Sequence, residues 1–143
     1  MATRGAVSAV PVTVDLAGFA AYLDGEIAAY LDDDLGVRIE DDAVRYAPLG
    51  VSTPPTRRWP PHEAGELKAS IEHHLDGPKT LIVEAHAPYA AYVELGTSPH
   101  SIDAHGPWSL HNAVTGQYFG PHVNHPGQAP ESYLRAALYQ ERA

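Results

Sequence analysis

Pro88-Tyr-Ala-Ala-Tyr-Val-Glu-Leu-Gly-Thr97 is the stretch of this 143-residue chain that decides its fold. Residues 89–95 predict a short helix, and Gly96 can end it because glycine adopts a positive φ at little steric cost. Tyr89 and Tyr92 lie three residues apart, so both rings share one side of that helix and can cover a sheet. The stretch therefore predicts a helix on a sheet, followed by a turn that reverses the chain.

A long helix is expected upstream, after an N-terminal arm over residues 1–14. Asp15 is a suitable N-cap, and apolar residues then recur at steps of three and four. Gly36 costs about 1 kcal/mol inside a helix, yet the apolar period continues until Pro48 stops it. We expect one long, kinked helix over residues 15–47, with two shorter helices as the alternative. Its apolar face includes Leu16, Phe19, Leu23, Ile27, Tyr30, Leu31 and Leu35, and its opposite face carries Asp24, Glu26, Asp32 and Asp33.

A proline-rich loop follows this helix. Five prolines fall between residues 48 and 61, a density that excludes a helix and disfavours strand pairing. We expect residues 48–63 to project from the domain. Arg57, Arg58 and Trp59 lie at the far end of the loop, and arginine and tryptophan are enriched among residues that anchor protein interfaces.

The remaining predicted elements are short. Residues 80–85 are rich in β-branched residues and give the clearest strand, and the Asp76-Gly-Pro78 turn signal implies a hairpin with residues 71–75. Residues 66–70 predict a helical turn. Further strands are expected at residues 100–103, 108–114 and 118–123, and a terminal helix at residues 129–140 with Pro130 near its first position.

These elements predict a single α+β domain over residues 15–143. The long N-terminal helix and the C-terminal helix are expected to pack on a small, mainly antiparallel sheet, from which the proline-rich loop projects. A chain of this length can bury one core, and two domains would be crowded.

The composition of the chain argues against several classes of function. The absence of cysteine excludes disulfides and thiolate chemistry. A formal net charge of -9 argues against a protein that binds nucleic acid tightly by neutralising phosphates. The apolar N-terminal run is interrupted at Pro11, so it is too short for a signal peptide or a membrane span. We expect an intracellular protein without a membrane partner.

Nine histidines raise the alternative of a metal centre. Two spacings could bring ligands together, namely His100 with Asp103 and His105, and His122 with His125. Neither is the helical His-Glu-x-x-His motif, so we interpret these histidines as loop residues with ordinary hydrogen bonds. His73 and His74 are adjacent, and in a strand they would point to opposite faces and could not chelate one ion.

No enzyme motif is evident elsewhere. Ser98 and Ser101 lie near histidine and aspartate, but a Gly-x-Ser-x-Gly elbow is absent. Glu84 and Glu94 imply no cleft for acid–base catalysis, and phosphate-binding glycine patterns are lacking. We expect a protein that is not an enzyme, with no catalytic residue, metal or cofactor. A small histidine-based metal-dependent hydrolase and a monomeric protein-binding module remain the alternatives.

Five motifs follow one another over residues 43–138: Ala47-Pro48, Ala64-Gly-Glu-Leu-Lys-Ala-Ser-Ile71, the stretch quoted first, His125-Pro-Gly127 and Tyr133-Leu-Arg-Ala-Ala-Leu138. In this order they resemble the tailed-phage neck protein family, whose members are also described as minor structural, tail-completion or tail-terminator proteins. Residues 49–63 resemble an insertion into the family pattern. Ala64, Tyr133 and Ala136 stand where the family usually has Thr, Phe and Pro.

The resemblance implies a structural virion protein that is assembled in the host cytoplasm. Copies would form a homo-oligomeric ring at the head–tail junction, six-fold in preference to twelve-fold, as a neck component or tail terminator. Adjacent connector and tail-tube proteins would be its partners, and DNA would pass through the channel without tight binding. As interface residues we predict Arg57, Arg58, Trp59, Tyr89, Tyr92, Glu94, Tyr133 and Arg135.

Overall fold

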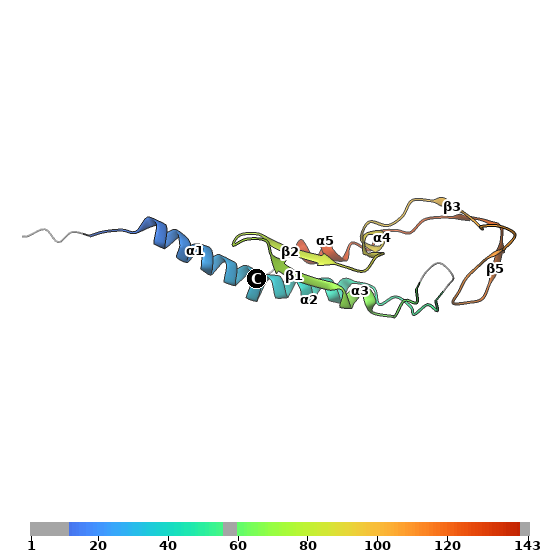
Figure 1. Ribbon diagram of the computed structural model, residues 1–143, viewed down its shortest axis with the longest axis horizontal. Coiled ribbons are helices and arrows are strands. Elements are labelled where there is room, and N and C mark those ends of the chain that lie inside the picture. Colours follow the sequence, from blue (N-terminus) through green and yellow to red (C-terminus); the bar gives the residue numbers. More distant parts are fainter. Residues whose placement is uncertain (1–11, 56–59, 141–143) are drawn as a thin grey trace, which may run out of the picture.

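The computed structural model describes residues 12–55 and 60–140, and it begins with one uninterrupted helical rod (Figure 1). The rod consists of α1 (Leu16–Tyr30), a π-helical segment η1 (Leu31–Gly36) and α2 (Val37–Tyr46). The Asp15 carboxylate caps its N-terminus by accepting a hydrogen bond of 3.0 Å from the Gly18 backbone N–H. The expectation of a single long helix is confirmed, and the π-helical segment within it was not predicted.

Gly36 is buried where the helical rod packs against the strand that carries His73. A Cβ at this position would lie 2.4 Å from Cδ2 of His73 and 2.8 Å from the carbonyl oxygen of Leu31. The His73 ring is held there by the Glu40 carboxylate, at 2.5 Å from Nδ1, and by the Asp32 carbonyl, at 3.1 Å from Nε2. Glycine is therefore required at the π-helical segment because an imidazole from another element packs against it.

A hairpin lies along the rod. After α3 (Glu66–Ala69), β1 (Ile71–Leu75) pairs antiparallel with β2 (Leu81–Ala85), in a register that runs from Ile71 opposite Ala85 to Leu75 opposite Leu81. Exposure alternates along β1, where Ile71, His73 and Leu75 are the more buried positions. Because strand side chains alternate between faces, one face of the hairpin packs on the helices and the other faces outward.

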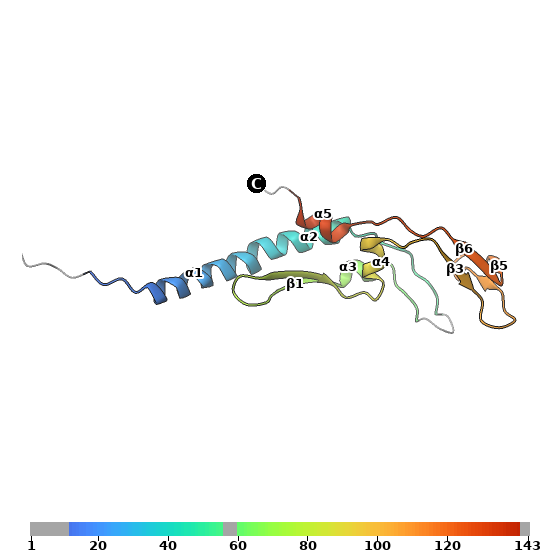
Figure 2. The same cartoon turned by 90° about the horizontal axis from the view of Figure 1, so that it is seen from above.

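The C-terminal half extends from the body as a second, long hairpin (Figure 2). Helix α4 (Ala90–Leu95) leads into β3 (His100–Asp103), which pairs with β6 (His122–His125), and β4 (Leu110–His111) pairs with β5 (Tyr118–Gly120) at the far end. The α+β class is confirmed, but the strands of the described residues form three two-stranded antiparallel sheets and not one small sheet. The strand predicted at residues 108–114 is reduced to two residues.

The last described helix, α5 (Tyr133–Leu138), begins later than residue 129. The backbone N–H of Gln128 donates to the Thr97 carbonyl, and that of Glu131 donates to the Val93 carbonyl, so these residues are already paired with α4 and the segment that follows it. Helix α5 packs on α2. The hydrophobic core draws on the helices and the first hairpin, and it consists of Ile39, Ala43, Ala47, Leu67, Ile71, Ala87, Ala90, Tyr133 and Ala137.

The proline-rich loop leaves the body beside α3, and Figure 2 shows its two legs running side by side. The legs are joined near the base by the Gly65 N–H to Leu49 carbonyl hydrogen bond of 2.7 Å and further out by a backbone pair between Thr53 and His62. Part of the predicted arm, residues 1–11, and the predicted anchors Arg57, Arg58 and Trp59 lie outside the described residues. Within residues 12–55 and 60–140, no helix is both long and apolar enough to cross a membrane.

Candidate subunit interface

Glu94, in α4, connects this helix to α5. Its side chain is buried, and its carboxylate accepts hydrogen bonds from the backbone N–H groups of Leu134 (2.9 Å) and Arg135 (3.2 Å), which are the orphan donors at the start of α5. The Arg135 guanidinium adds a contact of 2.9 Å to the same carboxylate and donates to the Glu94 carbonyl at 3.0 Å. A carboxylate at a helix N-terminus also matches the helix dipole, so Glu94 fixes where α5 sits.

Tyr133 lies beside this ion pair and has no solvent exposure. Its hydroxyl is buried without a hydrogen-bond partner. Burial raises the pKa of Tyr133 from 10.0 to about 12, and the nearby negative charge of Glu94 adds to the shift. Burial likewise raises the pKa of Tyr89, whose ring meets His62 edge to face at a centroid distance of 5.3 Å.

The structure therefore brings four of the predicted interface residues together at the α4–α5 junction: Tyr89, Glu94, Tyr133 and Arg135. The side chains of Glu94 and Tyr133 are buried within the subunit. They could therefore affect assembly only by setting the position of α5. Arg135 is half exposed and Tyr92 is 62% exposed, which leaves both accessible to another chain.

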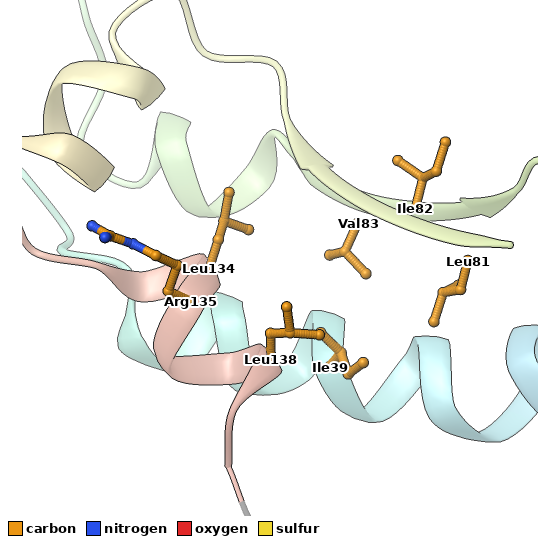
Figure 3. Close-up of a pocket in the computed structure, with 7 residues that line it drawn as sticks. All are labelled: Ile39, Leu81, Ile82, Val83, Leu134, Arg135 and Leu138. Atoms are coloured by element: carbon orange, nitrogen blue, oxygen red, sulfur yellow. The ribbon is translucent and has the colours of Figure 1, made fainter.

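An apolar groove lies next to this junction. It measures about 360 Å³ and is bounded by α2, β2 and α5. In Figure 3, Leu81 and Val83 point from β2 toward the helices while Ile82 points away, and Leu134 and Leu138 project from α5. The groove is lined by Ile39, Leu81, Ile82, Val83, Leu134, Arg135 and Leu138.

Helix α1 carries several exposed large apolar side chains, and none of its residues is buried. Figure 1 shows it extending past the end of the first hairpin. The exposed fraction is 73% for Leu16, 57% for Phe19 and 40% for Ile27. We call the exposed set Leu16, Phe19, Leu23, Ile27 and Tyr30 the α1 stripe. Apolar side chains are more stable when they are removed from water, so the exposed α1 stripe is suited to contact with another chain.

The far hairpin exposes a second group of large side chains. Trp108, Tyr118 and Phe119 lie on or beside β4 and β5 and are 69%, 74% and 45% exposed. Tryptophan and tyrosine are the residues most enriched at interface anchors. The molecule thus presents unpaired apolar surface at both of its ends.

Of the histidine patterns considered in the sequence, His100 with Asp103 and His122 with His125 lie on the β3–β6 ladder, whereas His105 lies beyond the end of β3. His100 lies opposite His125, with ring centroids 5.0 Å apart, and Asp103 lies opposite His122 at the other end of the ladder. The hydrogen bond of 2.6 Å to Asp103 is the main cause of the raised pKa of His122. The two pairs are separated by the length of the ladder, so they do not form one ligand set.

The chain matches no protein-family model, no curated protein and no solved structure.

Sequence reasoning identified the residues of the α4–α5 junction but missed the groove. The apolar character of Leu134 and Leu138 was visible, yet only the structure shows that β2 leaves room beside them. The periodicity of the α1 stripe was visible too. Its exposure was not, because an apolar helical face normally indicates the side that packs on the core.

Proposed function

We propose that this protein is a structural subunit of a tailed-phage neck, and that its copies close into a ring at the head–tail junction as a neck component or tail terminator. The observation that carries the proposal is the α1 stripe, an apolar helix face that the subunit itself leaves uncovered. The ordered motifs of the sequence support the same assignment. The proposed ring lies in the virion, after assembly in the host cytoplasm.

The elongated subunit supplies both halves of a ring contact. The α1 stripe lies at one end, and the groove between α2, β2 and α5 lies on the body. When the α1 stripe of one copy enters the groove of the next, the contact is heterologous, and repetition by a fixed rotation closes a ring. Burial of apolar surface is favourable by about 25 cal/mol per Å², which makes both surfaces more stable covered than exposed.

The net charge of -9 suits a ring with DNA at its centre. Acidic surface repels the phosphate backbone, so a channel lined by it lets DNA slide without tight binding. The far hairpin, with Trp108, Tyr118 and Phe119, is the surface that we assign to an adjacent connector or tail-tube protein.

Electron microscopy of phage particles that carry the chain tests this function. Gold labelling of the chain should mark the junction between head and tail, and particles assembled without the chain should accumulate as separate heads and tails. Label on the capsid shell or the tail tip, or normal joining in its absence, would contradict the proposal.

A further inference from the structure

The outward face of the β1–β2 hairpin gathers three side chains that have no part in the proposed assembly. Glu72, Glu84 and His86 each offer one donor atom, and these atoms all lie within 4.8 Å of one another. Nε2 of His86 is 2.8 Å from Oε1 of Glu72 and 3.7 Å from Oε1 of Glu84. Among the described residues, this is the one such group of three or more.

The strand register creates this group. Glu72 and Glu84 are direct partners in the ladder, and two carboxylates in that position repel each other. The backbone N–H of His86 donates to the Ser70 carbonyl at 3.0 Å, which continues the pairing beyond the last strand residue. His86 therefore lies on the same face as Glu84, two residues on, and diagonal to Glu72.

We propose that Glu72, Glu84 and His86 bind one divalent transition-metal ion, for which zinc is the representative. Zinc lies about 2.0–2.2 Å from nitrogen and carboxylate ligands in a tetrahedral site, which separates its ligand atoms by about 3.3–3.6 Å. The 3.7 Å between His86 and Glu84 matches that separation, and the 2.8 Å between His86 and Glu72 needs to open by about half an ångström. Water completes the coordination, because all three side chains are at least partly exposed.

The chemistry of the ligands selects the ion. An imidazole favours zinc and its neighbours in the transition series over magnesium and calcium, which prefer oxygen ligands alone. Two carboxylates neutralise the charge of a divalent ion, and the ion removes the repulsion between Glu72 and Glu84. His74 Nδ1 lies 3.5 Å from the same Glu84 oxygen and is placed to orient that carboxylate.

The ion would connect the two strands beyond their backbone hydrogen bonds. Since it binds the folded hairpin and holds its open end together, it stabilises the fold by mass action. This role is independent of whether the chain forms a ring.

Calorimetric titration of the tag-free full chain, stripped of metal with a chelator, tests the proposal with zinc chloride as the probe. We expect one zinc per chain and a rise in melting temperature that magnesium chloride does not produce. His86→Ala and Glu84→Gln should each weaken zinc binding by about tenfold or more. His122→Ala removes another exposed histidine that is paired with a carboxylate, and it should leave the affinity and the stoichiometry unchanged.

If Glu72, Glu84 and His86 form only an ion-paired cluster, the protein should show no stoichiometric zinc binding. Absence of stoichiometric zinc binding, or zinc binding that His86→Ala leaves intact, would overturn the proposal. Far-ultraviolet circular dichroism of each metal-free variant establishes that it is folded, and Glu84→Gln, which keeps the shape of the side chain, serves where His86→Ala lowers stability.

Discussion

Replacement of Glu94 by alanine should destabilise the subunit strongly, although the change lies outside the apolar core. The substitution removes the acceptor for two backbone N–H groups of α5 and for the Arg135 guanidinium. Loss of one partner of a buried ion pair costs about 3–5 kcal/mol. Arg135 is half exposed, so its share is screened by solvent, and we expect a loss of about 3 kcal/mol.

Urea unfolding followed by circular dichroism measures this loss directly. Glu94→Gln keeps an amide oxygen for the helix N-terminus and should cost about 1–2 kcal/mol, the difference expected for a hydrogen bond to an uncharged acceptor. Glu26→Ala is the matched control, because it removes an exposed carboxylate from α1 and should change stability by no more than about 0.5 kcal/mol. Equal stability of Glu94→Ala and Glu26→Ala would refute the reasoning.

Three further predictions concern Gly36, Tyr133 and His73. Gly36→Ala should lower stability by about 1–3 kcal/mol, because its Cβ meets His73 and the Leu31 carbonyl, whereas Gly25→Ala, with nothing within 4 Å, should be neutral or stabilising; equal urea midpoints would contradict this. Tyr133→Phe should stabilise the protein by about 1 kcal/mol, because it removes an unpaired buried hydroxyl. It should also reduce the loss of stability between pH 10 and about 12, where the phenol of the unfolded wild-type chain ionises before that of the folded one. An unchanged dependence of unfolding on alkaline pH would contradict this prediction. The hydrogen bond to Glu40 raises the pKa of His73, so its stabilisation is complete below pH 6.5 and is lost as the pH rises through the raised value, and Glu40→Gln should flatten that dependence in urea titrations.

Local sequence signals predicted much of the fold. Asp15 and the three- and four-residue apolar period were sufficient for the long helix, and the Asp76-Gly-Pro78 turn with the β-branched run was sufficient for the first hairpin. Gly96, at a φ of 73°, ends α4 as expected. Each of these features depends on residues close together in the chain, which is why sequence alone specified it.

Features that depend on distant residues were missed. The buried side of Gly36 is formed by His73, which belongs to another element, so nothing near the glycine indicated the π-helical segment. Helix α5 starts late because Thr97 and Val93 have already engaged the preceding backbone. The Glu72–Glu84–His86 group required the strand register, which sequence predicted only as the existence of a hairpin.

The candidate interface could be predicted only in part, because some of its features depend on residues that are distant in the chain. The residues of the α4–α5 junction stood out in sequence, but their division into buried and accessible side chains comes from packing between helices that are 40 residues apart. The α1 stripe was recognised as apolar and expected to pack within the domain. Its exposure follows from the position of the first hairpin, which lies along the rod and reaches α1 at the Lys79–Asp24 ion pair but leaves the α1 stripe exposed (Figure 1).

Native mass spectrometry of the purified full chain over a concentration series tests the central claim most directly. If the α1 stripe joins one copy to the next, the wild-type chain should form a closed oligomer, with six copies favoured over twelve. A variant with Phe19, Leu23 and Ile27 all changed to serine should remain a folded monomer, because these side chains are exposed in the isolated subunit. A wild-type chain that stays monomeric at every concentration, or a variant that assembles as well as the wild type, would contradict the account.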